Sequence, residues 1–253
     1  MMIKTSIGNT IIKLDNVDST NYYALKLLEE QNVEDGTVIT ANYQTLGKGH
    51  GKNLWFSDPG TNLLLSIILF PNFLKAETQF LLNKTISLGI LDFVSPLVKD
   101  RNCTIKWPND IYINDRKTAG ILIQNSIHGY VFQNTIIGIG INMNQEKFPD
   151  DIPNPTSIKI ESGSFYDLEA CRKKLLKSIR LRYHQLKSGI EEMIHRDYLH
   201  SLYWYNEYHN FKIQNRKFKA RITGVNEFGK LILEDEKKEI TECDFKEVEY
   251  LPY

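Results

Sequence analysis

The chain has 253 residues, of which 42% are hydrophobic and 25% are charged, values that are ordinary for a soluble globular protein and argue against a disordered or fibrous chain. Its 31 basic and 31 acidic residues cancel, so no overall charge attracts nucleic acid or an anionic membrane. The sequence has no charged leader followed by an apolar run, and its three cysteines lie outside CxxC spacing, which favours reduced thiols. We therefore expect a cytoplasmic protein with no membrane or nucleic-acid partner.

Helical and strand-like patterns alternate along the chain. Residues 18–21, Asp-Ser-Thr-Asn, are candidate N-caps ahead of apolar residues at helical spacing, which predicts a helix over 20–31. Apolar residues at three- and four-residue intervals predict a long helix over 78–98 and one or two helices over 167–204. Runs of β-branched and apolar residues predict strands over 38–41, 62–69 and 131–141. This order indicates an α/β (α+β) fold with a mixed β-sheet flanked by helices.

The last part of the chain has a different pattern. Apolar and basic side chains alternate from Lys217 to Ile222, and two further leucines alternate after a turn at 226–229, which is typical of short strands. We expect two domains, an α/β domain over residues 1–208 and a small β-domain over residues 209–253.

The segment Lys106-Trp107-Pro108-Asn109-Asp110 sets charged and amide side chains into apolar, strand-like sequence. Isoleucines at period-two spacing on both sides of Asn114-Asp115 predict a hairpin. Lys106, Asp110 and Lys117 should then gather near one sheet face. Two cations, a carboxylate and the Asn109 amide can hold a triphosphate with its metal ion, so the segment predicts a nucleotide site.

A glycine-rich loop follows the strand predicted at 38–41. Its glycines at 47, 49 and 51 permit close approach of backbone amides to a ligand, while Lys48, His50 and Lys52 add positive charge. The loop matches neither a Walker motif nor GxGxxG, and residues 138–143 also fail GxGxxG. We interpret residues 45–54 as an anion-closing flap and find no support for a nicotinamide-binding domain.

Five ordered blocks of the sequence resemble the motif set of biotin protein ligases. They are residues 18–21, 44–55, 106–110, 116–122 and 138–143. The resemblance covers roughly residues 15–145, and the Lys106 to Asp110 block is its most specific part. It implies a class II synthetase-like catalytic domain followed by a small SH3-like β-barrel. Some members carry an N-terminal helix-turn-helix domain, but about fifteen residues precede the first block, so we expect a short form without DNA regulation.

The chemistry implied by the resemblance has two steps. Biotin and ATP form biotinyl-5'-AMP, and a lysine of a biotin carboxyl carrier domain of a carboxylase then takes the biotinyl group. Two unit anions about 4 Å apart repel by about 4 kcal/mol at an effective dielectric of 20, so cations must neutralise the encounter. By resemblance Lys117 bridges the biotin carboxylate and the α-phosphate, and Lys48 is the second catalytic candidate. Asp110 and Asn142 are candidates to hold Mg²⁺.

The resemblance and the chemistry of the two ligands together assign the binding residues. Neutral hydroxyl and amide groups suit the ureido ring of biotin, small residues leave room beside the sheet, and Trp55 covers adenine or packs the flap. The biotin-binding candidates are Ser19, Thr20, Asn21, Gln44, Gly47, Lys48, His50, Lys117, Gly120 and Gly138. The ATP-binding candidates are Lys48, Trp55, Lys106, Asn109, Asp110, Lys117 and Asn142.

The flap departs from the family pattern, which usually places arginine at the positions of Lys48 and His50. Lysine lacks the planar fork of arginine, and histidine carries less charge near pH 7. We therefore expect weaker retention of the adenylate than in members with arginine.

Structural interpretations of the same residues remain open. Ser19 and Thr20 alone fit helix caps, Lys106 and Lys117 alone fit edge-strand charges, and Asn109 alone fits a turn. A lipoate ligase or octanoyltransferase and a non-catalytic biotin-binding protein are the alternative functions. The sequence leaves open which carboxylase is the acceptor and whether the protein is a monomer or a homodimer.

Overall fold

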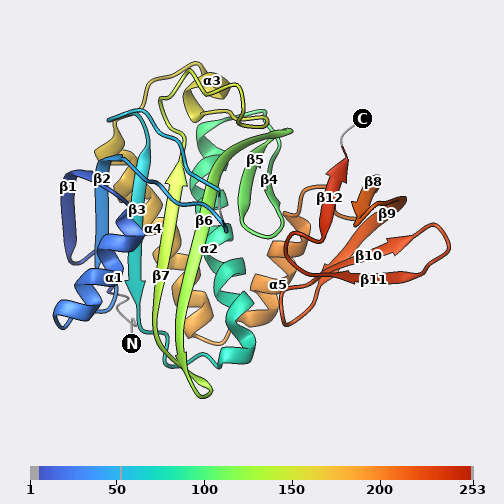
Figure 1. The fold of residues 1–253 in the computed structure, drawn as a ribbon, viewed down its shortest axis with the longest axis horizontal. Helices are drawn as coiled ribbons and strands as arrows, with labels where there is room; N and C mark the ends of the chain where they lie inside the picture. The colour runs from blue at the N-terminus through green and yellow to red at the C-terminus, as the bar shows by residue number, and fades with distance from the viewer. Residues whose placement is uncertain (1–5, 52, 252–253) are drawn as a thin grey trace.

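The computed structural model describes residues 6–51 and 53–251 (Figure 1). Two of the expectations from sequence concern residues outside this described part: Lys52, which was expected to add charge to the flap, and residues 1–5, which belong to the N-terminus where no leader was expected. The chain forms a seven-stranded sheet with the order β1-β2-β3-β7-β6-β5-β4 and a five-stranded sheet with the order β11-β10-β9-β8-β12. The second sheet is built from the C-terminal segment and lies beside β4 and β5 (Figure 1).

In the first part of the chain α1 follows β1, α2 follows β2 and β3, and α3 to α5 follow the four strands β4 to β7. The strands of the first sheet are β1 Ile11–Val17, β2 Val38–Gln44, β3 Leu63–Leu69, β4 Cys103–Lys106, β5 Asp110–Ile113, β6 Arg116–His128 and β7 Val131–Ile141. The helices are α1 Thr20–Glu30, α2 Gln79–Val94, α3 Ile158–Ser162, α4 Leu168–Lys187 and α5 Glu191–His200, with 3-10 turns η1 Ala76–Thr78 and η2 Ser95–Leu97. The second sheet contains β8 Tyr208–Ile213, β9 Arg216–Val225, β10 Leu231–Asp235, β11 Ile240–Cys243 and β12 Val248–Leu251.

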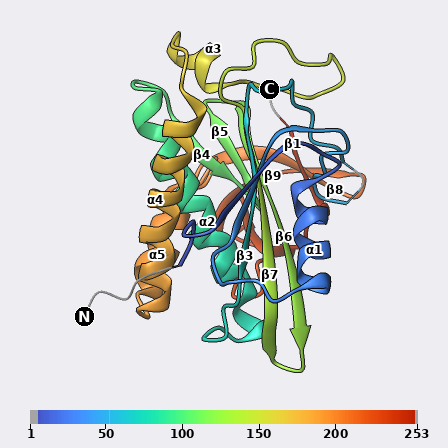
Figure 2. The ribbon, with the colours of Figure 1, turned by 90° about the vertical axis from the view of Figure 1, so that its left-hand side faces the viewer.

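Helices cover the first sheet unequally. Helices α2, α4 and α5 lie on one face, whereas α1 lies on the other (Figure 2). Strand β3, Leu-Leu-Leu-Ser-Ile-Ile-Leu, is buried at all seven positions, as expected for a central strand covered on both faces. The face with α1 therefore has open sheet beyond that helix, and the polar residues of β5 and β6 lie there.

Helix α2 is apolar enough to raise the question of a membrane. Residues Ala76–Leu97 meet the length and hydropathy of a membrane span, but 72% of that window is buried inside the protein. Its apolar side chains belong to the main core together with those of β3 and α4. This is the packing of a core helix, because its apolar surface is already covered by protein.

Most predicted elements are present, but strands β1 and β4 of the first sheet were not predicted, nor were β8, β11, β12 and helix α3 individually. Strand β1 pairs in parallel with β2, and its exposed positions carry Lys13, Asp15 and Asn16, two of them in succession, which hides the alternation of a strand. Strand β4 has only four residues, too few for a periodic signal. The predicted hairpin around Asn114 forms between β5 and β6, and Asn114 adopts a left-handed φ of 53° at the turn.

The second sheet begins at Tyr208, next to the predicted boundary, and polar contacts from Trp107 and Lys84 are among those that join it to the first part of the chain. Trp107 Nε1 donates to the carbonyl oxygen of Gly229 at 2.9 Å. Lys84 of α2, which is 2% exposed, places its Nζ 3.0 Å from His195 Nδ1 of α5 and 3.5 Å from the carbonyl oxygen of Val225. A buried ammonium therefore lies where α2, α5 and the second sheet meet.

Candidate active site

A cavity of about 620 Å³ is bordered by the start of α1, the flap, strands β5 to β7 and the second sheet. Its volume lies in the range of small-molecule sites. It brings together most of the residues predicted for biotin and ATP. Those on its wall are Ser19, Thr20, Asn21, Gln44, Lys48, His50, Trp55, Lys106, Asn109, Asp110, Lys117, Gly120 and Gly138.

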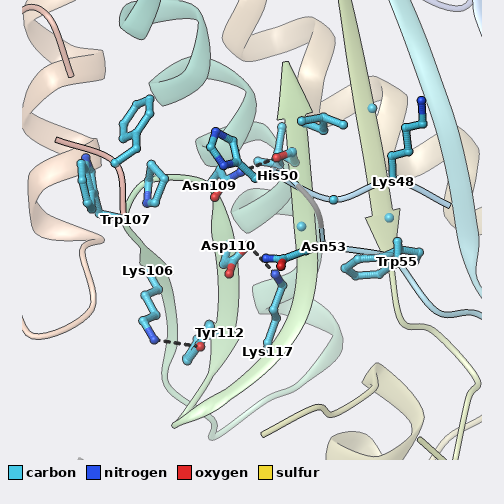
Figure 3. A pocket seen from close by; sticks show the side chains of 18 of the residues that line it. Lys48, His50, Asn53, Trp55, Lys106, Trp107, Asn109, Asp110, Tyr112 and Lys117 are labelled. Atoms are coloured by element: carbon cyan, nitrogen blue, oxygen red, sulfur yellow. Dashed lines mark hydrogen bonds and ion pairs between the residues drawn. The ribbon is translucent and has the colours of Figure 1, made fainter. Parts of the chain in front are cut away.

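Lys117 and Asp110 meet in this cavity. Lys117 Nζ lies 2.7 Å from Asp110 Oδ1, and the Lys117 side chain is 31% exposed (Figure 3). Asp110 pairs in register with Gly120. The Lys117 side chain passes over this glycine, since a Cβ added to Gly120 would lie 3.4 Å from Lys117 Cε. The bulge between Ile111 and Tyr112 re-aims the side chains of this hairpin. The result is an ammonium held in place by a carboxylate.

Lys106 lies on the same face but turns away from Lys117. Its Nζ donates to the Tyr112 hydroxyl at 3.1 Å (Figure 3) and lies over the rings of Tyr112 and Tyr250, 5.0 and 4.8 Å from their centroids. Burial lowers the pKa of Lys106 and the Lys117 charge lowers it further, whereas Asp110 opposes the shift. The two lysines thus serve different parts of the cavity.

A neutral hydrogen-bond network forms the floor below α1. Thr20 donates to Gln44 Oε1 from its backbone nitrogen at 2.7 Å and its hydroxyl at 3.0 Å. Asn21 Nδ2 donates to Gln124 Oε1 at 2.9 Å. Ser66 Oγ lies 2.8 Å from Thr20 Oγ1 and 2.6 Å from Asn21 Oδ1. These are uncharged donors and acceptors, as the ureido ring of biotin requires.

The alternative reading of Ser19 as a simple cap is not supported. Ser19 occupies the N-cap position of α1, but its side chain makes no capping hydrogen bond. Sequence reasoning missed Ser66 and Gln124. Ser66 is a single polar residue in an apolar strand, Gln124 begins the polar run 124–126, and only the sheet brings each of them to Asn21.

Glycines form the floor beside this network. A Cβ at Gly138 would lie 2.3 Å from Asn21 Oδ1, and one at Gly140 would lie 2.4 Å from Trp55 Cε2. Trp55 therefore lies directly on the sheet, and its buried Nε1 has no hydrogen-bond partner within the described chain. Gly140 belongs to the cavity wall and was not among the predicted binding residues.

The flap is a short turn whose two flanking segments lie antiparallel to each other. Gly49 N donates to Asn53 O at 2.8 Å, and Trp55 N donates to Gly47 O at 2.8 Å. Gly47, predicted to contact biotin, is not among the residues that line the cavity. A Cβ there would lie 2.5 Å from Trp55 O, so this glycine lets the two segments approach.

The flap cations do not converge on Lys117. Lys48 Nζ lies 5.6 Å from the centroid of the Tyr22 ring and points away from Lys117 (Figure 3). His50 packs edge-on against Phe245, with ring centroids 6.1 Å apart. Both line the cavity, and the catalytic role expected of Lys48 stays a prediction.

Asn142 lies apart from the other predicted ATP-binding residues. It does not line the cavity; its Nδ2 donates to Thr156 O at 2.9 Å, and its buried Oδ1 has no hydrogen-bond partner among the described residues. The alternation that turns Gly138 and Gly140 toward the cavity ends with β7 at Ile141. The role of Asp110 and Asn142 in holding Mg²⁺ stays a prediction. In the described ranges, no group of three His, Cys, Asp or Glu residues could hold a metal ion.

Asn109 has a structural role in addition to its place on the cavity wall. Its Nδ2 donates to the carbonyl oxygen of Ile121, and its own carbonyl oxygen accepts from Ile121 N at 3.0 Å. These bonds tie the loop before β5 to β6. The peptide bond between Trp107 and Pro108 in the same loop is cis.

Comparison with known proteins agrees with this geometry. Residues 14–142, just over half of the chain, match the Biotin/lipoate A/B protein ligase family. The chain belongs to this family. The match contains the start of α1, the flap and strands β4 to β6, which carry the polar residues of the cavity.

Relatives of the ligase family cover different shares of the chain. The bifunctional ligase/repressor BirA of Bacillus spizizenii is 34% identical over 190 residues, or 72% of this chain and 56% of that protein. BirA of Escherichia coli is 31% identical over 176 residues, or 68% of this chain and 53% of that protein. This chain thus spans about half the length of these relatives.

A solved structure extends the likeness to the second sheet. The biotin protein ligase from Aquifex aeolicus in complex with biotin and ATP has a TM-score of 0.79 and 26% identity, and the match covers 96% of this chain and 99% of that one. The predicted fold class, a mixed sheet flanked by helices with a small C-terminal β-domain, is confirmed.

The second sheet, which lies outside the ligase family match, also contributes to the cavity. Phe245, Lys246, Val248, Glu249 and Tyr250 line it, as do Tyr203 and Trp204 just before the sheet. The sequence pattern placed these residues in a separate β-domain and did not assign them to the site. Only the packing of the second sheet against β4 and β5 brings them to the cavity.

Proposed function

We propose that the protein is an ATP-dependent biotin protein ligase, which forms biotinyl-5'-AMP and transfers biotin to a lysine of a biotin carboxyl carrier domain of a carboxylase. One observation carries the proposal: the Lys117 ammonium is held by Asp110 in a cavity that has a neutral polar floor at one side. The family membership and the Aquifex likeness support the same activity.

In the first step a carboxylate oxygen of biotin attacks the α-phosphorus of ATP. The new P–O bond forms as the bond to pyrophosphate breaks, and the electron pair leaves on pyrophosphate. The Lys117 ammonium faces the place where both anions meet and offsets their repulsion. Asp110 holds that ammonium in position, so little reorganisation is needed when the substrates enter.

Mg²⁺ is part of the nucleotide substrate in this proposal. The described residues contain no cluster of carboxylates for a protein-held ion, and Mg²⁺ is commonly held by phosphate oxygens, water and one or two carboxylates. Asp110 is the one predicted metal residue on the cavity wall. MgATP therefore brings its own ion.

In the second step the acceptor lysine attacks the acyl carbon of biotinyl-5'-AMP. Its ammonium first loses a proton to water, the C–N bond forms as the C–O bond to AMP breaks, and a second proton leaves the nitrogen. Until then the flap and Trp55 shield the activated acyl group from water. The ATP substrate and three free cysteines suit the reducing cytoplasm, where we place the protein.

The test is incubation with biotin, MgATP and a biotin carboxyl carrier domain, followed by mass spectrometry of the acceptor and of the small-molecule intermediate. We expect biotin-dependent pyrophosphate release and one biotinyl group on the acceptor. Lipoate and octanoate in place of biotin are the controls. Preference for either would favour the lipoate branch of the family, and tight biotin binding without pyrophosphate release would favour a non-catalytic binding protein.

A further inference from the structure

Ser66 is the single polar residue of strand β3, whose other residues are leucine and isoleucine. Its side chain is fully buried and does not line the cavity, yet it contacts two residues of α1 that do, Thr20 and Asn21. Ser66 lies opposite Gly138 in the register of β3 and β7. A Cβ at Gly138 would lie 2.3 Å from Asn21 Oδ1, so the glycine lets Asn21 reach the serine. Helix α1 lies on this face of the sheet (Figure 2).

The side-chain amide of Asn21 has a defined orientation. Its Nδ2 donates to Gln124 Oε1 at 2.9 Å and lies 3.4 Å from the carbonyl oxygen of Leu122. The reverse orientation would bring two carbonyl oxygens together, so Oδ1 is the atom that faces Ser66. An amide oxygen carries no proton. The 2.6 Å contact between Ser66 Oγ and Asn21 Oδ1 therefore uses the one proton of the serine hydroxyl.

The proton of the Thr20 hydroxyl is then held inside the protein. Thr20 Oγ1 lies 2.8 Å from Ser66 Oγ and 3.0 Å from Gln44 Oε1. Both oxygens are acceptors here, because the serine has given its proton to Asn21 and an amide oxygen carries none. If the Thr20 proton turned toward the cavity, Thr20 Oγ1 and Ser66 Oγ would face each other at 2.8 Å with no proton between them. Thr20 therefore presents lone pairs, and no donor, to a ligand in the cavity.

We propose that Ser66 is a positioning residue for biotin: it keeps the Thr20 hydroxyl an acceptor, so that the floor selects a ligand with an N–H donor at this place. The inference rests on the proposed function, in which one of the two ureido nitrogens of biotin supplies this donor. A site built around such a hydrogen bond rejects an analogue without the donor, because its buried acceptor is left unpaired. Lipoate has no N–H group, so the same acceptor disfavours it.

The test compares biotin with its two cyclic carbamate analogues, in which one or the other ureido N–H is replaced by oxygen. Each analogue has nearly the shape of biotin but presents an acceptor in place of a donor. For the carbamate whose oxygen lies opposite Thr20, we expect binding to the wild-type protein about 100-fold weaker than that of biotin, measured by calorimetry. In Ser66→Ala the Thr20 proton is free to turn toward this oxygen, so the ratio of the two Kd values should fall to about tenfold. The ratio for the other carbamate should be equal in the two proteins.

An enzymatic measurement and a matched control separate this role from a loss of packing. In biotin-dependent pyrophosphate exchange, Ser66→Ala should raise the KM for biotin about tenfold and leave kcat within about twofold. Ser87→Ala is the control, because Ser87 is also fully buried and donates to an asparagine, Asn83 Oδ1, at 3.3 Å. Ser87 belongs to α2 on the other face of the sheet, so both carbamate ratios and the KM for biotin should keep their wild-type values.

Ser66→Cys is the second variant. A thiol is a weaker donor and acceptor than a hydroxyl, so the ratio for the same carbamate should fall to a value between those of the wild type and Ser66→Ala. The inference is overturned if biotin and both carbamates weaken by the same factor in Ser66→Ala, which is the result of a purely structural role. If Ser66→Ala does not fold, a wild-type ratio in Ser66→Cys overturns it. Pyrophosphate exchange that depends on lipoate and not on biotin in the wild-type protein would instead contradict the proposed function.

Discussion

Lys117 and Asp110 form a 2.7 Å ion pair between neighbouring strands β5 and β6. Gly120 lies opposite Asp110 in the strand register, and a Cβ there would lie 3.0 Å from Trp55 Cζ3 but at an ordinary 3.4 Å from Lys117 Cε. This glycine therefore makes room for Trp55 above the hairpin that carries the ion pair. This pair is the centre of the proposed adenylation site.

Replacement of Lys117 by methionine should abolish most adenylation. We expect Lys117→Met to reduce biotin-dependent pyrophosphate exchange by about 100-fold or more, the magnitude seen when one transition-state donor is removed. Lys159→Met is the matched control, because Lys159 also pairs with a carboxylate, Glu146, and its side chain is 30% exposed. Normal exchange in Lys117→Met would remove this lysine from the reacting centre.

Gly138→Ala should weaken biotin binding. The added methyl would lie 2.3 Å from Asn21 Oδ1 and would displace Asn21 from Ser66 and Gln124. We expect an increase of about tenfold or more in the Kd for biotin by calorimetry, since displaced buried polar groups cost about 1–3 kcal/mol. Gly224→Ala is the control, because a Cβ there meets only Ile232 Cδ1, at 3.5 Å. Equal biotin affinity in the wild type and Gly138→Ala would contradict the placement of biotin on this floor.

His50→Arg should slow the release of biotinyl-5'-AMP. Arginine supplies a permanent charge and a planar fork for the phosphate, whereas His50 now packs against Phe245. We expect release to slow by about tenfold in rapid-dilution experiments, a change that corresponds to about 1.4 kcal/mol. His128→Arg, at the exposed end of β6, is the control. Release from the native protein that is equal to or slower than release from His50→Arg would reject the role of His50.

The buried Lys84 should make stability depend on pH. Burial lowers its pKa from 10.5 to about 8, so between these values the unfolded chain binds a proton that the folded chain does not. The free energy of unfolding should therefore rise with pH from about 8 toward 10.5, by up to about 3 kcal/mol. Below about pH 8 the burial cost of the ammonium is fully present.

Denaturation by urea at pH 7 to 10 in the wild type and in Lys84→Met measures this effect. Several buried tyrosines titrate only at higher pH and are the same in both proteins. The difference in unfolding free energy between the two proteins therefore isolates the contribution of Lys84. Methionine has similar length and no charge, so the rise should be absent in the variant. A wild-type curve parallel to that of Lys84→Met over this pH range would show that Lys84 keeps an ordinary pKa.

The sequence predicted the long, periodic elements well. Helix α2 and strands β3 and β7 have apolar repeats long enough to identify alone, and the hairpin around Asn114 has turn chemistry. The edge strand β1 was missed, because its exposed positions carry polar residues and its partner is distant in sequence. An edge strand is hydrogen-bonded to a neighbouring strand on one side only, and its exposed positions carry polar residues, so its apolar pattern in the sequence is weak.

The candidate site was predicted in part. Lys106, Asp110 and Lys117 lie close in sequence on the successive antiparallel strands β4, β5 and β6, so strand alternation was enough to place them on one face. Asn142, predicted for ATP and Mg²⁺, lies off the cavity wall, because alternation does not continue past the end of β7. Ser66, Gln124 and Tyr250 gave no local signal, since each is an ordinary residue of its own strand.

What the sequence by itself determined is the chemistry available to the protein: a lysine and a carboxylate in a glycine-containing hairpin, a glycine-rich flap, and hydroxyl and amide residues at a helix start. What only the tertiary structure decided is which of these groups meet. Asn21 contacts Gln124 across 103 positions of sequence, and Trp107 bonds to Gly229 across 122. Local periodicity determines helices and strands, but sheet register and the packing of the second sheet determine which side chains share a cavity.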